Sequence, residues 1–271
     1  MDVNFLKNGI TVLDVTNDIP TIYVGYDSRE DESYEVLKYT AKKYASGPIN
    51  VYPIKQDLLR RIGLYRRERA YKTEINTHQY YDIFDGKPFA TDFSFSRFLT
   101  PFLHRLEGWA LFMDCDMYFR SDPLELFEKY NNSEYAIYCV KHDHVQASTE
   151  THKMYGNEQY YFTRKNWSSF IMYNCSHKGH NNFTVDDVNT KTGRWLHNFK
   201  WLDDTLIGEL PEEWNWLDGH SSVDINAKNV HFTRGGPWFR TWKPLNEQSQ
   251  IYAQEWKLVR NEYRDFFNRS R

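Results

Sequence analysis

The stretch that decides the fold of this sequence is Trp109-Ala110-Leu111-Phe112-Met113-Asp114-Cys115-Asp116-Met117-Tyr118-Phe119. An apolar run leads directly into two aspartates, and apolar residues resume at Met117. A short, continuous apolar run followed by polar residues is typical of a strand that is buried on both faces of a sheet. The sequence therefore predicts a buried strand that ends at Asp114.

The two aspartates at the end of this strand need a counter-charge, because carboxylates are almost never buried without a partner. Carboxylate oxygens are preferred ligands of Mg²⁺ and Mn²⁺, and open α/β sheets bind ligands at the carboxyl ends of their strands. The pattern predicts a metal site at this edge of the sheet. The alternative is an ordinary turn, since Asp-x-Asp triplets also occur by chance in loops.

The composition is that of a globular protein. The chain has 271 residues, 26% of them charged, with a net charge of −3. This length suits one large α/β domain or two small ones, and the absence of repeats or an evident linker favours one. The near-neutral charge predicts no nucleic-acid partner. Aromatic residues make up 17%, which suits stacking on sugar rings or bases, although a core packed with rings is the alternative.

Cysteine usage and the apolar segments predict the cellular compartment. The three widely spaced cysteines indicate neither a disulfide framework nor a zinc cluster. The first residues lack the basic and apolar pattern of a signal peptide. No apolar stretch approaches the roughly 18 residues of a membrane helix, so we expect no transmembrane segment and a cytoplasmic protein.

The beginning of the chain has the pattern of a strand, a helix and a second strand. The β-branched and aromatic residues at 21–26 predict a strand that runs into a loop, residues 31–44 have helical spacing, and residues 49–54 predict the next strand. Such a βαβ unit opens many nucleotide-binding folds. The residues at the end of the first strand are then candidates for a base- and ribose-binding edge, or else form an ordinary strand–loop junction: Tyr23, Gly25, Tyr26 and Asp27.

The later segments supply further elements. We expect a solvated helix face in the arginine-rich stretch 58–70, the alternative being a role in holding an anionic donor or acceptor. We also expect helices at 93–106 and 203–209, strands at 135–140, 170–174 and 229–232, and a C-terminal helix at about 247–268. Arg97 lies in a mostly apolar helix just before the Asp-x-Asp strand. It is a reasonable partner for a phosphate or a carboxylate, and the alternative is an ion pair on the helix surface.

The order of these motifs resembles that of GT-A-fold glycosyltransferases, and within them the retaining, glycogenin-like and bacterial galactosyltransferase-like group, glycosyltransferase family 8. The resemblance spans roughly residues 20–240. The matching pieces are Tyr23-Val24-Gly25-Tyr26-Asp27, Ser96-Arg97-Phe98-Leu99, Met113-Asp114-Cys115-Asp116, residues 166–174, Asp203-Asp204 with Leu210-Pro211-x-x-Trp214-Asn215, and His231 with Gly235, Pro237 and Trp238.

The resemblance implies the GT-A fold, a Rossmann-like α/β fold of nucleotide-diphospho-sugar transferases with a mixed sheet flanked by helices. We expect a single catalytic domain over residues 1–271. Its nucleotide-binding half would span about 20–120, its acceptor and sugar half about 121–245, and a C-terminal helix would follow at 247–268.

The resemblance also implies a nucleotide-sugar donor, usually a UDP-sugar, and Mn²⁺. Asp114 and Asp116 match the metal-binding pair, and His231 matches the third ligand. Imidazole favours Mn²⁺ over Mg²⁺, although Mg²⁺ is possible. Asp203 and Asp204 lie where the family holds the transferred sugar and the reacting face, so they are the expected catalytic residues. The residues expected to contact the donor, besides Asp114 and Asp116, are Tyr23, Gly25, Tyr26, Asp27, Arg97, Cys115, Ser168, Ser169, Arg234 and Gly235.

The sequence departs from the family pattern after the histidine. Arg234 stands three residues on, where the family has glycine, and Gly236 precedes Pro237, where the family has lysine. Arg234 or Lys243 is then the candidate cation for the phosphates. Asp203-Asp204 also replaces the family's Asp-Gln pair. These changes leave the donor sugar and the retaining stereochemistry open.

The predicted function is transfer of a hexose from a UDP-sugar to a hydroxyl group of a glycan, lipid or protein acceptor. One alternative is a nucleotidyltransferase that makes sugar nucleotides. Such an enzyme normally has a Gly- and Lys-rich phosphate loop after its first strand, whereas this chain has Gly25-Tyr26-Asp27-Ser28-Arg29 there. The other alternative is a non-catalytic carbohydrate-binding protein, which the aromatic content permits.

Overall fold

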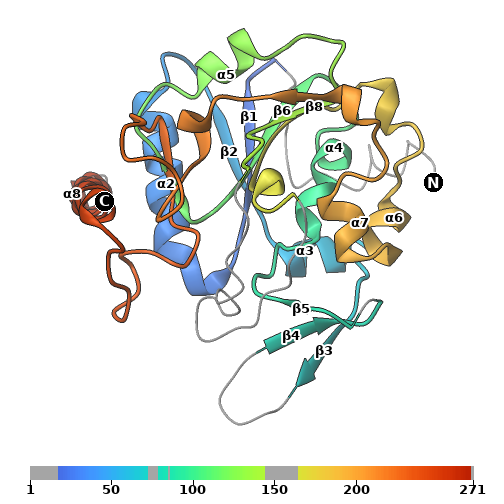
Figure 1. Ribbon diagram of the computed structural model, residues 1–271, viewed down its shortest axis with the longest axis horizontal. Coiled ribbons are helices and arrows are strands. Elements are labelled where there is room, and N and C mark those ends of the chain that lie inside the picture. The colour runs from blue at the N-terminus through green and yellow to red at the C-terminus, as the bar shows by residue number, and fades with distance from the viewer. Residues whose placement is uncertain (1–17, 73–78, 85, 144–163, 270–271) are drawn as a thin grey trace.

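A six-stranded mixed sheet forms the centre of the computed structural model, which describes residues 18–72, 79–84, 86–143 and 164–269 (Figure 1). The strand order is β10-β8-β9-β6-β1-β2, and within this sheet only β9 runs antiparallel to its neighbours. The strands are β1 (Thr21–Gly25), β2 (Asn50–Ile54), β6 (Trp109–Asp114), β8 (Ile137–Cys139), β9 (Phe170–Asn174) and β10 (Ile207–Glu209). The prediction of a mixed α/β sheet is confirmed.

Strand β6 lies in the middle of this sheet, between β9 and β1. Its residues from Ala110 to Met113 are fully buried, and the strand ends at Asp114, as the apolar run predicts. Asp114 is paired in register with Gly25 at the end of β1. The carboxyl ends of β1 and β6 therefore lie side by side, which is where an open α/β sheet binds its ligands.

A small second sheet brings a distant part of the chain to the same place. It consists of β7 (Met117–Phe119), β12 (Asn229–His231) and β11 (Trp216–Leu217). Strand β12 runs antiparallel to β7 and places His231 opposite Met117. The backbone N–H of Phe232 continues this pairing and donates to the carbonyl of Asp116 at 2.9 Å. This pairing determines the position of His231.

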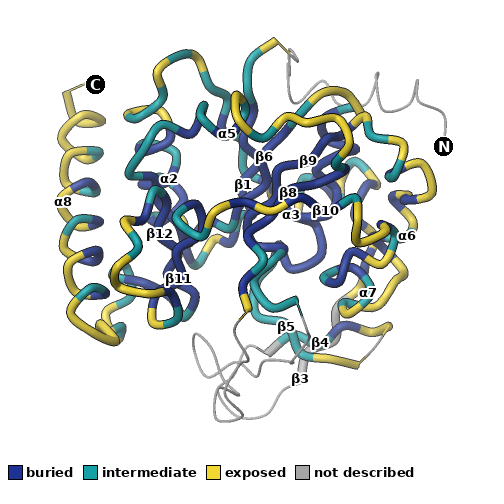
Figure 2. Tube along the Cα trace, turned by 45° about the horizontal axis from the view of Figure 1, so that its top comes forward, coloured by how far each residue is buried: buried dark blue, intermediate teal, exposed yellow. Residues whose placement is uncertain are grey.

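Helices cover both faces of the large sheet, with α2 on one side and α4, α6 and α7 on the other (Figure 1). The C-terminal helix α8 packs outside α2 and turns a buried stripe toward it (Figure 2). No described helix is long and apolar enough to cross a membrane. The helices are α2 (Asp31–Tyr44), α3 (Gln56–Arg61), α4 (Thr100–Leu103), α5 (Leu124–Lys129), α6 (Val185–Thr190), α7 (Gly193–His197) and α8 (Glu247–Arg269).

A separate three-stranded sheet, β3 (Arg69–Lys72), β4 (Gln79–Asp82) and β5 (Pro88–Phe89), projects from the body of the protein (Figure 1). Arg67 anchors it through Asp82, with Nε–Oδ1 and Nη2–Oδ2 distances of 2.6 Å and both side chains 1% exposed. The prediction of a solvated helix face over 58–70 is wrong at this point. Helix α3 ends at Arg61, and Arg67 is buried because a paired carboxylate balances its charge.

Two predicted helices are shorter than the sequence pattern suggests. Over 93–106 the chain forms a 3₁₀ helix η2 (Ser96–Leu99) and then the single turn α4. Pro101 has no N–H to donate, so it can stand only in the first turn of α4. The positive φ angles of Arg105 and Leu106, 59° and 58°, end the helix.

Over 203–209 the expected helix is replaced by the 3₁₀ turn η6 (Asp204–Leu206) and strand β10. Sheet pairing overrides the local pattern here, because β10 pairs with β8 along its whole length. Gly208 permits this pairing, since a Cβ at its position would lie 2.3 Å from the ring of Tyr138.

Candidate metal and nucleotide site

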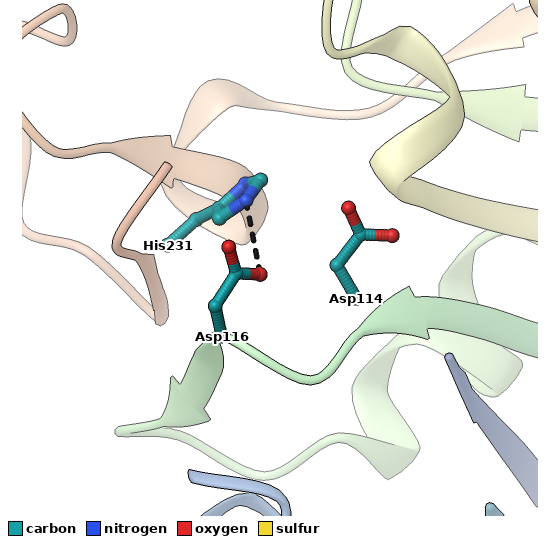
Figure 3. Close-up of side chains that lie close together, drawn as sticks. All are labelled: Asp114, Asp116 and His231. Atoms are coloured by element: carbon teal, nitrogen blue, oxygen red, sulfur yellow. Dashed lines mark ion pairs between the residues drawn. The ribbon is translucent and has the colours of Figure 1, made fainter. Parts of the chain in front are cut away.

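Asp114, Asp116 and His231 converge at the carboxyl end of β6, and one ligand atom from each lies within 4.8 Å of the others (Figure 3). The Nε2 atom of His231 is 3.2 Å from Oδ1 of Asp116. The aspartates are two residues apart, Asp114 at the end of β6 and Asp116 in the bend between β6 and β7. Cys115, between them, is completely buried, and burial raises the pKa of its thiol well above the usual range.

This set of side chains fits a divalent cation. The two carboxylates are 13% and 15% exposed, so they are accessible without being fully solvated. Donor atoms around one octahedral ion of this kind lie about 3 to 4 Å apart, so small side-chain movements would close the three groups on it. Two carboxylates with one imidazole suit Mn²⁺ or Mg²⁺, and the imidazole favours Mn²⁺.

Arg97 lies next to the carboxylate of Asp114. Its Nη1 is 2.9 Å from Oδ1 of Asp114, and the same nitrogen donates to the carbonyl of Ser168 at 2.8 Å. The guanidinium also lies over the rings of Phe93 and Phe112. Arg97 is 6% exposed. The ion pair with Asp114 is internal to the protein, so a contact of Arg97 with the donor stays a prediction.

The other ring nitrogen of His231 also has a partner. Nδ1 lies 2.9 Å from Oδ1 of Asn215, a fully buried residue in the 3₁₀ helix η7 (Glu212–Asn215). Asn215 is part of the motif Leu210-Pro211-x-x-Trp214-Asn215, from which no role was predicted for it. The signal that could have identified it is chemical, because a metal-binding histidine generally donates its second N–H to an oxygen.

Glu30 is a second residue that sequence reasoning missed. It ends the 3₁₀ helix η1 (Ser28–Glu30) and is 1% exposed. Burial and the nearby carboxylate of Asp116 hold the pKa of Glu30 well above its usual range. In the sequence, the one feature that could have pointed to Glu30 is its position three residues after Asp27.

The residues predicted to form a nucleotide-binding edge at the end of β1 differ in their surroundings. Tyr23 does not reach the site: its ring is 1% exposed, and its hydroxyl donates to the carbonyl of Leu103 at 3.3 Å. Gly25 is required by packing, because a Cβ there would lie 2.4 Å from the ring of Phe93. Tyr26 directly follows Gly25, the register partner of Asp114; it is partly exposed, and its hydroxyl donates to Oδ1 of Asp31 at 2.6 Å.

Asp27 is almost fully buried and structurally engaged. Burial alone would raise the pKa of its carboxyl, but bonds from the Arg29 guanidinium and from backbone N–H groups hold that pKa below the usual value. The backbone N–H groups of Arg29 and Asp92 donate to it at 3.0 and 3.2 Å. In this structure the carboxylate of Asp27 therefore holds the loop after β1 in shape.

Ser168 and Ser169 lie in the 3₁₀ helix η4 (Trp167–Ser169), just before β9, and their side chains have partners inside the protein. Oγ of Ser168 is 2.6 Å from Nδ1 of His197. Oγ of Ser169 donates to the carbonyl of Asn166 at 2.7 Å and accepts from Nδ2 of Asn215 at 3.0 Å. Ser169 therefore connects to the histidine of the metal-binding group through Asn215.

Asp203 and Asp204 are not in contact with Asp114, Asp116 or His231. Asp203 is the N-cap of η6, where the backbone and side chain of Thr205 donate to it and lower the pKa of its carboxyl. Asp204 is 76% exposed and pairs with Arg164 at 2.6 Å. A role for either aspartate in holding a sugar stays a prediction.

Arg234 and Gly235 form the turn directly after His231. Gly235 has a φ of 80°, a conformation that favours glycine, and its N–H donates to the carbonyl of Phe232 at 3.1 Å. Arg234 is partly exposed on this turn, and Lys243 is exposed further along the chain. A contact of either cation with the donor stays a prediction.

Comparison with known proteins gives one relative in sequence and several in structure. No family model matches the chain. It is 42% identical over 247 residues to Protein CDI of Arabidopsis thaliana, which covers 89% of this chain and 86% of the relative.

Among solved structures, the glycosyltransferase GlyE of Streptococcus pneumoniae TIGR4 superimposes with a TM-score of 0.53 and 14% identity over 93% of this chain. This chain spans only 64% of the GlyE chain. The galactosyltransferase LgtC, crystallised with donor and acceptor sugar analogs, gives a TM-score of 0.50 and 9% identity, over 89% of this chain and 95% of that one.

The structural matches establish the fold, and the sequence match establishes the family. Identity of 42% across most of both chains is far above what unrelated proteins of one fold share. The chain therefore belongs to the same family as Protein CDI of Arabidopsis thaliana, and it has the GT-A fold of the glycosyltransferases GlyE and LgtC.

Proposed function

We propose that this protein is a metal-dependent glycosyltransferase that transfers a hexose from a UDP-sugar to a hydroxyl group of a glycan, lipid or protein. The observation that carries the proposal is the convergence of Asp114, Asp116 and His231 at the carboxyl end of β6. The GT-A fold supports it, because in this fold a carboxylate pair at that position faces a nucleotide-sugar donor.

The chain's own residues would hold the donor as follows. Asp114, Asp116 and His231 would bind Mn²⁺, or Mg²⁺ in its place. The ion would neutralise the negative charge that develops on the diphosphate as UDP departs. Arg97 would keep Asp114 oriented, and Arg234, on the turn after His231, would contact the diphosphate. Tyr26 would face the nucleotide at the end of β1.

In the transfer step, the acceptor oxygen forms a bond to the anomeric carbon of the sugar, and the bond from that carbon to the phosphate oxygen breaks. With retention, the acceptor approaches on the face from which the phosphate departs, and its proton passes to the departing phosphate oxygen. The products are the glycoside and UDP. No strong protein base is needed, so the protein contributes positioning and charge stabilisation. Asp203 and Asp204 are proposed to hold the transferred sugar.

The proposal is tested by a hydrolysis screen of UDP-, GDP- and TDP-sugars with Mn²⁺. We expect Mn²⁺-dependent release of UDP from a UDP-hexose, because water can replace the unknown acceptor. Asp116→Ala and His231→Ala are each expected to abolish this release while the circular dichroism spectrum stays unchanged. Full turnover in both variants would refute the site.

A product assay and a calorimetric titration separate the alternative functions. A nucleotidyltransferase would form a UDP-sugar and pyrophosphate from UTP and a sugar phosphate, and would not release UDP from the sugar nucleotide. A non-catalytic carbohydrate-binding protein would ignore the nucleotide, so its calorimetric titration with UDP would give no heat with or without Mn²⁺.

A further inference from the structure

A chain of buried hydrogen bonds connects the backbone of Asn166 to the imidazole of His231. Oγ of Ser169 is 2.7 Å from the carbonyl oxygen of Asn166, and Nδ2 of Asn215 is 3.0 Å from the same hydroxyl. Oδ1 of Asn215 is 2.9 Å from Nδ1 of His231. Ser169, Asn215 and His231 are 3%, 0% and 2% exposed. We call these groups the Asn166–Ser169–Asn215 chain.

The proton positions in this chain can be assigned from its first member. A carbonyl oxygen can only accept, so the hydroxyl of Ser169 must donate to Asn166. A hydroxyl has one hydrogen, and Ser169 can therefore only accept from Asn215. The atom of Asn215 that faces Ser169 must be the amide nitrogen, which places the amide oxygen toward His231. The orientation of this amide thus follows from its partners.

The same reasoning fixes the tautomer of His231. The amide oxygen of Asn215 can only accept, so Nδ1 of the imidazole carries the hydrogen and donates it. In the neutral ring Nε2 then has a lone pair, and this is the nitrogen that lies 3.2 Å from Asp116. A neutral imidazole binds a metal through the ring nitrogen that carries no hydrogen.

The backbone at Asn166 is shaped for this role. Asn166 has a φ of 64°, in the left-handed region that asparagine tolerates better than most residues. Its carbonyl accepts from both the N–H of Ser169 at 3.2 Å and the hydroxyl of Ser169 at 2.7 Å. The side-chain amide of Asn215 has a hydrogen-bond partner at its nitrogen and at its oxygen. It therefore cannot rotate without losing both bonds.

We propose that the Asn166–Ser169–Asn215 chain is a positioning device that holds His231 in the Nδ1–H tautomer and aims Nε2 at a divalent cation. Asn215 is the member that contacts His231, and Ser169 acts through Asn215. The inference rests on the proposed function for the cation site, but the tautomer itself is a property of the protein without metal. The two can therefore be tested apart.

The first test measures Mn²⁺ affinity from the electron paramagnetic resonance signal of free Mn²⁺, in the presence of UDP. Loss of an outer hydrogen-bond partner typically weakens a metal site about 10- to 100-fold, and we expect this loss in Asn215→Leu. Asn215→Asp keeps an acceptor for Nδ1–H but has no N–H for Ser169, so it should lose less Mn²⁺ affinity than Asn215→Leu. Asn189→Leu is the matched control, because Asn189 is 3% exposed and bonds to Leu64 and Arg67 instead. It should lower stability without changing Mn²⁺ affinity.

The second test reads the tautomer by long-range ¹H–¹⁵N NMR on the metal-free protein, with the His231 signals assigned from their loss in His231→Asn. We expect the Nδ1–H form in the wild type, and a mixture of tautomers in Ser169→Ala, where the Asn215 amide is free to turn over. A wild-type ring without a hydrogen on Nδ1, or an unchanged tautomer in both Ser169→Ala and Asn215→Leu, would overturn the inference.

The outcomes separate this inference from the proposed function. If the wild type binds Mn²⁺ and Asn215→Leu binds it equally well, the positioning role falls and the proposed function stands. If the wild type binds no Mn²⁺ with UDP, the proposed function and the cation-directed role both fall, even where the tautomer assignment holds.

Discussion

Arg97 and Asp114 form an ion pair of 2.9 Å directly beside the proposed cation site. Both side chains are largely buried, at 7% and 13% exposure. The same arginine nitrogen donates to the carbonyl of Ser168, so its position is fixed from two sides. One positive charge therefore already balances one of the two carboxylates at the end of β6, before any cation is bound.

Removing the positive charge of Arg97 should make the stability of the folded protein depend more strongly on Mn²⁺. Arg97→Met leaves Asp114 without its partner, and breaking a buried pair costs about 3–5 kcal/mol; we expect the lower end, because Asp114 is partly exposed. Mn²⁺ should then raise the melting temperature of the variant more than that of the wild type, since a ligand of the native state stabilises by mass action. Differential scanning fluorimetry with and without Mn²⁺ measures both effects.

Arg120→Met is the control for this prediction. Arg120 pairs with Glu255 at 2.8 Å, away from β6, and this pair is more exposed than that of Arg97 and Asp114, at 24% and 29%. Its loss should lower stability and leave the response to Mn²⁺ at the wild-type value. Equal Mn²⁺ protection of wild type and Arg97→Met would show that the charge of Arg97 does not compete with the ion for Asp114.

The buried pair between Arg67 and Asp82 should dominate the attachment of the β3–β4–β5 sheet. Asp82→Ala leaves the guanidinium buried and unbalanced, and we expect a loss of about 3–5 kcal/mol in the free energy of unfolding. The double variant Arg67→Met/Asp82→Leu should lose less than Asp82→Ala, because no charge is left behind. Urea denaturation followed by tryptophan fluorescence gives both values.

The neighbouring Arg66 supplies the comparison, since it pairs with Asp186 at the surface, with 46% and 71% exposure. Arg66→Met should change the free energy of unfolding by less than about 1 kcal/mol. A double variant less stable than Asp82→Ala would mean that the pair is worth more than the apolar replacement.

His180 should make the protein less stable in mild acid. Its Nδ1 accepts from the indole of Trp201 and its Nε2 donates to the carbonyl of Ala136, both at 3.2 Å, so the neutral ring satisfies both partners. Burial lowers its pKa to about 4. The unfolded chain binds a proton near pH 6.5 and the folded chain only near pH 4, so stability is complete above pH 6.5 and falls as the pH drops toward 4.

The contribution of His180 over this range is about 3 kcal/mol. His180→Gln does not titrate, so its free energy of unfolding should fall less steeply between pH 6.5 and 4 than that of the wild type. His104, whose pKa burial also lowers to about 4, keeps part of the slope in this variant. Identical slopes for the two proteins would contradict the assignment.

The sequence predicted the central parts of this site because they depend on strong local patterns. The apolar run before Asp114 is typical of a buried strand, and two aspartates at its end favour a cation site over an ordinary turn. His231 was reached through a resemblance in motif order, and the pairing of β12 with β7 explains the placement. That pairing is a long-range contact, which composition and periodicity alone do not reveal.

What could not be predicted depends on partners that are distant in sequence. Arg67 is indistinguishable from its neighbouring arginines until β4 presents Asp82. Residues 203–209 have a helical pattern, but β8 recruits them into the sheet. Tyr23 alternates with Gly25 along β1 and was expected at the ligand edge, whereas its side chain points into the core. The role of Asn215 is visible only from the atoms around it.

The most direct test of the central claim is a calorimetric titration of the wild-type protein with UDP, with and without Mn²⁺, repeated with Asp116→Asn and His231→Asn. If Asp114, Asp116 and His231 form one cation site that holds a nucleoside diphosphate, UDP should bind in the presence of Mn²⁺ and lose most of its affinity in its absence. Either substitution should weaken Mn²⁺-dependent binding by more than the roughly 10- to 100-fold that outer partners contribute. The same UDP affinity with and without Mn²⁺, or an affinity that neither substitution changes, would contradict it.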